Sequence, residues 1–248
     1  MENPQGPPSL GVNIDHVATV RNARGEGFPS PLQAAFTALE AGASNVTCHL
    51  REDRRHIRDD DVRIISSLTG RLNLEMAAEE GIIKIALEIK PLSVTIVPEK
   101  RKELTTEGGL NVIQDVKKYS EINSGFRAAN IATSAFIEPD LGQVEAAKKS
   151  GFDCIEIHTG NYAREFALVK TGILKELEKI KAAAAYAGNI GLGVNAGHGL
   201  DYKNIYNIAA INGMREFNIG FSIISHSIFA GLETAVREMA SILRNVRR

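Results

Sequence analysis

The sequence predicts a closed (β/α)8 TIM barrel with extra helices, and three observations support this fold class. Eight short apolar, β-branched runs alternate with longer helix-like stretches along the chain. The 248 residues are the usual size for one such barrel. No GxGxxG motif follows the first apolar run and no linker-like composition marks the midpoint, so a doubly wound open sheet is the less favoured alternative.

The elements are expected in strict alternation. Ser30 and Pro31 mark a helix start as N-cap and first residue, and the acids at 59–61 suit a first helical turn. Gly42 and Gly151 are expected to end helices in the left-handed conformation. The expected strands span residues 10–15, 45–49, 71–75, 93–97, 131–137, 154–158, 191–195 and 216–219. The expected helices span residues 31–41, 59–68, 77–89, 110–123, 139–150, 166–187, 202–211 and 225–243.

Composition narrows the domain organisation and the partners. We expect a flexible tail over residues 1–9 and a single catalytic barrel domain over 10–248. With a net charge of −1, the chain has no electrostatic attraction as a whole to nucleic acid or to an anionic membrane. Its apolar runs are too short to span a bilayer. The start of the chain lacks a signal-peptide pattern, and Cys48 and Cys154 are isolated in apolar runs. These features predict a cytoplasmic protein with neither nucleic-acid nor membrane partners.

Polar side chains gather at the expected strand ends. Alternate residues of a barrel strand point inward, and function lies at the carboxyl ends of the strands. Burying so many polar groups costs free energy unless they are hydrogen-bonded or used. The pattern therefore predicts an active site at this rim. If alternate residues point inward, four expected strands each place a polar pair on the inner face, namely Asn13 with Asp15, Thr47 with His49, Asn73 with Glu75, and Glu156 with His158. Asn195 ends the seventh expected strand.

Histidines add titratable groups to the same rim. Histidine ionises near neutral pH and is the commonest general acid or base. Glu75 ends an apolar strand, so desolvation is expected to raise the proton affinity of its carboxylate. Together these groups favour proton-transfer chemistry. The histidines at or just after strand ends are His16, His49, His56, His158 and His198, whereas His226 falls in a helical stretch.

Anion binding is the second expected property of the rim. Arginines follow the first two strands, where they suit phosphate or carboxylate, although Arg54 and Arg55 equally fit a solvated loop. Glycines follow the last two strands, the usual phosphate site of such barrels. The charged segment 98–109 fits either a lid or a plain surface loop. The arginines are Arg21, Arg24, Arg51, Arg54 and Arg55, and the glycines are Gly197, Gly199 and Gly220.

Metal and Schiff-base chemistry are weaker alternatives. His49, Glu75, Glu156, His158 and His198 are ligand types for a divalent ion. No H-x-H follows the first strand, and no segment has dedicated ligand spacing, so we expect no metal. No lysine stands at an expected strand end, which disfavours catalysis through a Schiff base on a lysine.

Eight motifs give the chain a family resemblance from Leu10 to the C-terminal helix. In order and in spacing they resemble the pyridoxine 5′-phosphate synthase family of the 1-deoxy-D-xylulose 5-phosphate-dependent vitamin B6 pathway. The motifs are GVNIDH (11–16), VRNARG (20–25), HLREDRRHI (49–57), NLEM (73–76), VPEKR (97–101), TTEGGL (105–110), EIHTG (156–160) and NAGHGL (195–200).

The resemblance implies a transferase-class synthase without a metal or organic cofactor, assembled as a homo-octamer. It would condense 1-deoxy-D-xylulose 5-phosphate with 3-amino-2-oxopropyl phosphate to pyridoxine 5′-phosphate, phosphate and water. Two other functions stay open, namely a non-catalytic sugar-phosphate-binding barrel and a metal-dependent barrel hydrolase. The partners expected are therefore small phosphorylated molecules.

The resemblance also implies a role for each matched residue. His49 and Glu75 would accept protons, His198 would donate one, and Glu156 would be a further acid–base or orienting group. Phe221 stands where the family commonly has histidine, which leaves only a backbone contact at that position. Asn13 and Arg24 would bind the amino-ketone phosphate, Asp15, His16, Arg51, His56 and Thr105 the deoxyxylulose phosphate, and Gly199 and Gly220, with the Phe221 backbone, a phosphate group.

Overall fold

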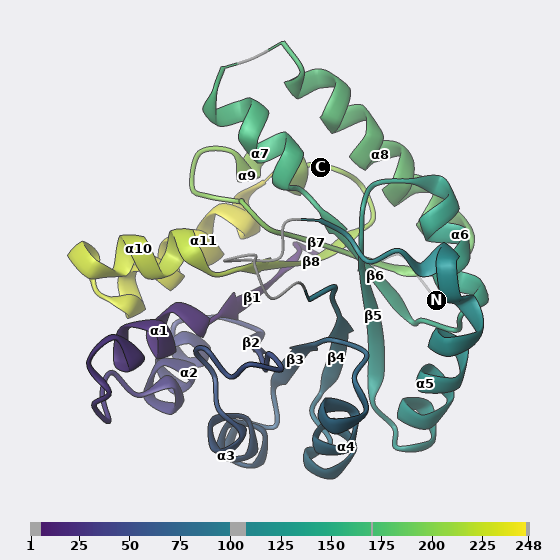
Figure 1. Cartoon of the computed structure of the whole chain (residues 1–248). Helices are drawn as coiled ribbons and strands as arrows, with labels where there is room; N and C mark the ends of the chain where they lie inside the picture. Colours follow the sequence, from purple (N-terminus) through teal and green to yellow (C-terminus); the bar gives the residue numbers. More distant parts are fainter. Residues whose placement is uncertain (1–5, 100–107, 170, 247–248) are drawn as a thin grey trace.

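The computed structural model describes residues 6–99, 108–169 and 171–246 and shows a closed parallel barrel. The strands pair in chain order, and the first pairs with the last, as Figure 1 shows. The predicted fold class is therefore confirmed. Thr105 and Lys100, together with most of the segment expected to be a lid or surface loop, lie outside the described residues.

Helices surround the barrel and connect successive strands (Figure 1). The strands are β1 (Ser9–Asn13), β2 (Asn45–His49), β3 (Leu72–Met76), β4 (Ser93–Ile96), β5 (Ala132–Ile137), β6 (Cys154–His158), β7 (Gly193–Gly197) and β8 (Met214–Ile219). The helices are α1 (Asp15–Arg24), α2 (Pro31–Glu40), α3 (Asp59–Thr69), α4 (Glu80–Ile89), the 3-10 turn η1 (Val112–Asp115), α5 (Val116–Ala128), α6 (Leu141–Lys149), α7 (Gly160–Ala167), α8 (Ile173–Asn189), α9 (Ile205–Ala209), α10 (Phe221–Ala230) and α11 (Leu232–Asn245).

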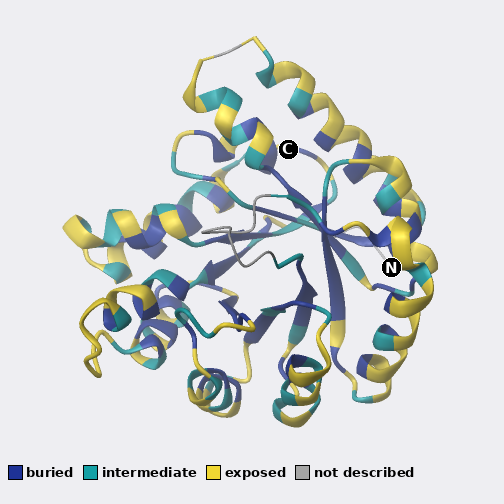
Figure 2. Cartoon of the chain, in the orientation of Figure 1, coloured by how far each residue is buried: buried dark blue, intermediate teal, exposed yellow. Residues whose placement is uncertain are grey.

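The two faces of each strand have different surroundings, as the period-two pattern predicts. In β3, Leu72 and Leu74 are fully buried in the apolar core, which lies between the strands and the helices. Each such side chain contributes about 1.5–3 kcal/mol when it is removed from water. The alternate residue Asn73 is hydrogen-bonded to Thr47 and Thr95 of the neighbouring strands. Figure 2 shows the result, with buried strands inside and exposed residues along the outer helix faces.

Local signals mark several helix ends as expected. The Ser30 hydroxyl accepts a hydrogen bond from the backbone N–H of Gln33 at 3.3 Å, with Pro31 next to it. Gly151 follows α6 with a φ of 77°, in the left-handed region that glycine tolerates. Among the described residues, no helix combines the length and apolarity that a bilayer crossing requires.

The boundaries of β1 and β7 differ from the prediction in a way that affects the site. β1 ends at Asn13, and Asp15 begins α1, a helix that the sequence analysis missed. Only Val17 and Ala18 among its apolar residues are buried, so its periodicity is weak. β7 covers 193–197 instead of 191–195, which places Asn195 in the middle of the strand and His198 directly after its end.

Two predicted helices are each divided in two. The expected helix at 166–187 is replaced by α7 and α8, with Gly172 as the N-cap of α8. The expected helix at 225–243 is replaced by α10 and α11, because Gly231 adopts a φ of 81° and a ψ of 149° between them. The apolar pattern continues across both interruptions, which explains why periodicity alone did not reveal them.

Candidate active site

A cavity of about 980 Å³ opens at the carboxyl ends of the strands. Most of its lining residues come from strand ends or the loops that follow them, the location predicted from strand parity. Helix α10 extends it outward through Phe221, Ser222, Ser225, His226 and Phe229. The predicted residues that line it are Asn13, Asp15, His16, His49, Arg51, His56, Glu75, Glu156, His198, Gly199, Gly220 and Phe221.

Two carboxyl groups, those of the buried Glu156 and the half-buried Glu75, occupy the inner part of the cavity. Glu156 accepts a 2.8 Å hydrogen bond from the Asn218 amide, and burial raises the pKa of Glu156 to about 8. Burial also raises the pKa of Glu75 well above its ordinary value, and the charges of Glu156 and Asp15 raise it further. Both carboxyls therefore hold a proton more tightly than an exposed carboxyl does, which equips the site for proton transfer.

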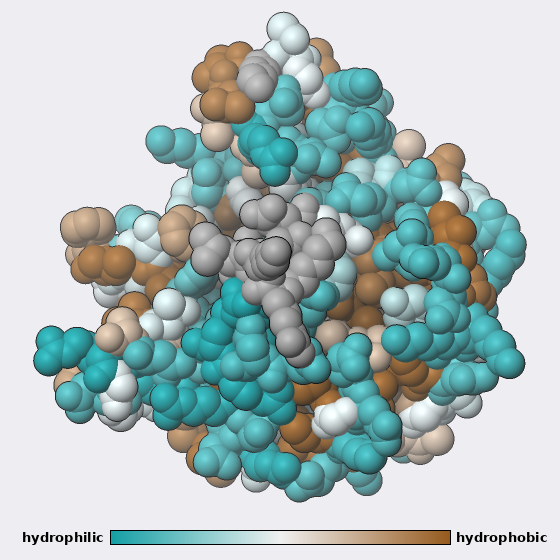
Figure 3. All heavy atoms as spheres, in the orientation of Figure 1, coloured by the Kyte–Doolittle hydropathy of each residue, from teal (hydrophilic) through white to brown (hydrophobic). Residues whose placement is uncertain are grey.

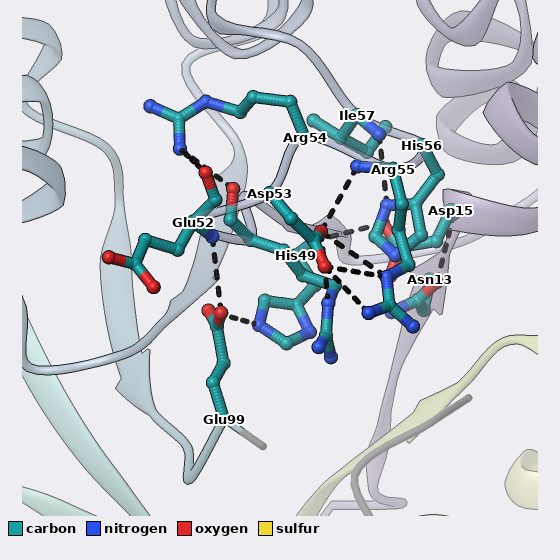
Figure 4. A network of polar contacts seen from close by, with 11 residues as sticks. Asn13, Asp15, His49, Glu52, Asp53, Arg54, Arg55, His56, Ile57 and Glu99 are labelled. Carbon is teal, nitrogen blue, oxygen red and sulfur yellow. Dashed lines mark hydrogen bonds and ion pairs between the residues drawn. The ribbon is translucent and has the colours of Figure 1, made fainter. Parts of the chain in front are cut away.

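His49 is held beside this pair by the sheet register and by two carboxylates. In the β2–β3 ladder, His49 is the register partner of Glu75. The backbone N–H of His49 donates to Asp15 Oδ1 at 2.9 Å, and its ring Nε2 lies 3.1 Å from Glu99 Oε1. Glu99 also accepts from the backbone N–H of Glu52, as Figure 4 shows. The His49 ring is thus oriented between strand β3 and the segment that follows β4.

Asp15 enters the site although it is not a strand residue. The Asn13 side chain accepts from the backbone N–H of Asp15 at 2.9 Å and donates to its carboxylate at 2.9 Å (Figure 4). This turn holds the first residue of α1 against the barrel mouth. The prediction that Asp15 faces the site is confirmed in position, but the cause is this turn and not strand parity.

The loop after β2 carries the basic side of the cavity. Arg55 lines the cavity and is paired with Asp53 at 2.6 Å, and this hydrogen bond lowers the pKa of Asp53 to about 2. Arg21 does not line the cavity. Instead, it bridges Asp61 and the carbonyl of His56, so it holds the loop in place.

His198 occupies the opposite side with an unusual backbone. Its φ is 77°, and the buried hydroxyl of Thr159 donates to the carbonyls of Gly197 and His198 at 2.8 and 2.7 Å. Burial, assisted by the charges of His158 and Arg164, lowers the pKa of His198 to about 4. His198 is therefore neutral at physiological pH in the absence of a bound anion.

The start of α10 lies close to the end of β1. Gly220 is the N-cap of α10, and a Cβ there would lie 3.0 Å from Cβ of Asn13, so a larger residue would have to displace the Asn13 side chain. The free N–H groups of a helix start suit a phosphate group. Phe221 is 70% exposed and packs edge-on to His16, with ring centroids 5.3 Å apart.

Besides Arg21, further predicted rim residues do not take the expected positions. Arg24 ends α1 and lines a separate hollow with Val20 and Phe28. His158 is buried behind the cavity, against the His198 ring. Asn195 lies below the rim in β7, because that strand is shifted by two residues from the expected range.

Several site residues were missed by the sequence analysis. Phe136 and His226 line the cavity, Glu99 contacts His49, and Glu138 contacts His158. Phe136 falls in the correct strand but gave no chemical signal, and His226 was assigned to a helix without a role. Glu138 could have been found from its position directly after β5, because functional residues of such barrels lie at the carboxyl ends of the strands.

Three donors could hold a cation at the inner end of the cavity. One ligand atom each from Asp15, His49 and Glu75 lies within 4.8 Å of the others. Carboxylates and imidazole suit several divalent metals. Two of these residues already have protein partners, since the Asp15 carboxylate accepts from the Asn13 side chain and from the backbone N–H of His49, and the His49 ring contacts Glu99. The same arrangement therefore also fits an acid–base cluster.

The barrel and its cavity, lined with carboxyl and imidazole groups at the carboxyl ends of the strands, are typical of a (β/α)8 enzyme. The chain belongs to the family described as pyridoxal phosphate biosynthesis protein PdxJ, whose model matches residues 10–245. It is 51% identical to a pyridoxine 5′-phosphate synthase from Prochlorococcus marinus over 97% of this chain and 98% of the relative. It is 52% identical to the synthase of Thermodesulfovibrio yellowstonii over 95% and 96% of the two chains.

Solved structures with low sequence identity support the fold alone. A 3-keto-L-gulonate-6-phosphate decarboxylase from Vibrio cholerae aligns with a TM-score of 0.65 at 11% identity, covering 98% of this chain and all of that one. A tryptophan synthase from M. tuberculosis aligns with a TM-score of 0.66 at 9% identity, covering 96% and 94% of the two chains.

Proposed function

We propose that this chain is a pyridoxine 5′-phosphate synthase that condenses 1-deoxy-D-xylulose 5-phosphate with 3-amino-2-oxopropyl phosphate, releasing phosphate and water. The observation that carries the proposal is the pair of carboxyls with raised pKa values, Glu75 and Glu156, in one cavity with His49 and His198. Joining an amine to a ketone and closing an aromatic ring requires repeated proton transfers and dehydrations. A set of acids and bases with displaced pKa values suits that sequence of steps.

The positions of the groups support the proposed acid–base roles. His49 and Glu75, adjacent in the sheet, are proposed as proton acceptors. His198, across the cavity, is proposed as the proton donor of the late steps, and a bound phosphate would favour its cationic form. Glu156, fixed by Asn218, is proposed to orient a reacting group or to exchange protons with Glu75.

The two phosphate groups would occupy different corners. Asn13, Gly199, Gly220 and the Phe221 backbone are proposed to hold the amino-ketone phosphate at the start of α10. Asp15, His16, Arg51 and His56, with Thr105 from outside the described residues, are proposed to bind the deoxyxylulose phosphate. Arginine is the side chain best suited to hold such a group by two hydrogen bonds.

A homo-octamer is proposed as the working assembly. Figure 3 shows hydrophobic residues at the free end of α10, where Ile228 and Phe229 are 73% and 92% exposed. Arg24, which does not line the cavity of its own chain, would bind phosphate only in the site of an adjacent copy. Light scattering would check the assembly, with a mass eight times 26.9 kDa expected and a monomeric mass contradicting it.

We also propose a cytoplasmic location and small phosphorylated partners only. The free thiols of Cys48 and Cys154 are compatible with a reducing compartment. The net charge of −1 gives no drive toward nucleic acid. Fractionation of the source cells, with this protein followed by antibody, would check the location.

The reaction itself can be tested directly. Purified protein incubated with both substrates is expected to form pyridoxine 5′-phosphate, and no product would contradict the proposal. Tight binding of either substrate without turnover would instead indicate the non-catalytic sugar-phosphate-binding barrel. The same assay after treatment with a chelator tests the three-donor cluster at Asp15, His49 and Glu75, and unchanged turnover is expected because the proposed steps need only proton transfer.

A further inference from the structure

Glu138 lies directly after β5 and joins two parts of the structure through one oxygen. Its Oε1 is 2.7 Å from Nδ1 of His158, and it accepts a 3.0 Å hydrogen bond from the backbone N–H of Gly109. The contact with His158 lowers the pKa of Glu138, so this carboxyl is ionised near neutral pH. An ionised Glu138 makes Nδ1 of His158 a donor, which fixes the ring orientation.

His158 in turn packs directly against His198. The two ring centroids are 4.9 Å apart with an interplanar angle of 57°, and His158 is only 4% exposed. A Cβ on Gly160 would lie 2.5 Å from Nε2 of His158 and 2.9 Å from Cδ2 of His198. The backbone at Gly160 therefore packs against both rings, and any larger residue would displace them.

Nε2 of His158 has no hydrogen-bond partner within the part of the chain that the structure describes. A buried polar atom without a partner costs about 1–3 kcal/mol. Such a cost is unexpected for a histidine that only packs in a core. It is consistent with a ring whose position serves its neighbour in the active site.

The charges around His198 come from three elements. His158 on β6 and Arg164 on α7 disfavour the cationic form of His198, as burial does, whereas Glu138 after β5 favours it. Proton donation requires that His198 carry a proton it can release. Among these neighbours, Glu138 supplies the only charge that favours the cation.

We propose that Glu138 is a positioning residue that acts through His158, holding that ring against His198 and supplying the negative charge that allows His198 to carry its proton. This inference rests on the proposed role of His198 as proton donor. Glu138 does not line the cavity, so it would affect the chemistry without touching substrate.

The test compares three variants of the full-length protein. E138Q removes the charge but retains an oxygen that can accept from His158, and E138D retains the charge on a shorter side chain. E145Q is the matched control, because Glu145 is an exposed acid on α6 that pairs with Lys149 away from the site. Hydrogen–deuterium exchange at imidazole C2, followed by mass spectrometry across pH, reports the pKa of each histidine without any need for turnover.

The sign of the expected shift follows from the charges. If His158 is neutral, E138Q removes one negative charge near His198 and lowers the pKa of His198. If His158 is charged, the substitution also removes a positive charge that disfavours the cation of His198, and a rise in the pKa of His198 would contradict the charge role of Glu138. We expect a lower pKa of His198 in E138Q and a turnover at neutral pH that is lower on the order of tenfold at unchanged KM. E138D should lie nearer to the wild type, and E145Q should match it.

The two readouts separate this inference from the proposed function. An unchanged pKa of His198 in E138Q, or an E138D variant with a larger shift than E138Q, would overturn the role of Glu138. Absence of synthase activity in the wild type would contradict the proposed function, while the exchange measurement would still decide how Glu138 affects His198.

Discussion

The substitution of glutamine for Glu156 tests the central electrostatic argument, because it removes an ionisable group from the cavity with little change in shape. Glu156 is 2% exposed, and burial raises its pKa from 4.5 to about 8. The folded chain therefore binds the proton of Glu156 more tightly than the unfolded chain does. The stability from this group is fully present below pH 4.5, and it is lost as the pH rises toward about 8.

The size of the stability change follows from the pH range over which Glu156 is protonated in the folded chain but ionised in the unfolded chain. Between pH 5 and pH 7, at about 1.4 kcal/mol per pH unit, the wild type should lose about 3 kcal/mol that the Glu156→Gln variant retains. For a chain of this length, that corresponds to roughly 8 °C in the unfolding temperature. The amide oxygen of the substituted glutamine can still accept the hydrogen bond that Asn218 donates to Glu156, so packing should be preserved.

Urea unfolding and calorimetry at fixed protein concentration would measure this difference at both pH values. The decisive quantity is the change with pH in the stability gap between the variant and the wild type, since a constant packing effect cancels. Glu145→Gln at an exposed position serves as the control and should show no such change. A gap that stays the same between pH 5 and pH 7 would refute the argument that burial keeps Glu156 protonated.

Three further outcomes follow from other contacts. Glu75→Gln should lower kcat by about a thousandfold with an unchanged circular-dichroism spectrum, because it removes a proposed proton acceptor, and wild-type turnover would exclude Glu75 from the chemistry. Arg21→Ala should cost about 1.5–3 kcal/mol in urea unfolding, since it removes the hydrogen bonds that Arg21 donates to the carboxylate of Asp61 and to the carbonyl of His56, and a loss below 1 kcal/mol would contradict this. Thr159→Val should lower the free energy of unfolding by about 1–3 kcal/mol and reduce turnover, because it removes both hydroxyl hydrogen bonds that hold the backbone at His198. Unchanged kinetics would show that these hydrogen bonds do not contribute to catalysis.

Much of the barrel could be predicted from local patterns. The alternation of apolar runs and helical stretches determined the fold class, because each pattern reflects which faces a strand or helix must bury. Strand parity correctly placed His49, Glu75 and Glu156 on the inner face at the carboxyl ends. The helices α1, α7 and α10 were missed or merged, because their apolar spacing is weak or continues across a glycine interruption.

The sequence by itself therefore determined the barrel, the family resemblance and the inner acid–base residues, all of which depend on residue type and spacing. Tertiary structure alone showed that Glu99 contacts His49 and that Glu138 contacts His158. It also placed Arg24 outside the cavity of its own chain. The physical reason is that such contacts join residues 20–50 positions apart, where side-chain distances depend on how strands close and loops fold and not on local periodicity.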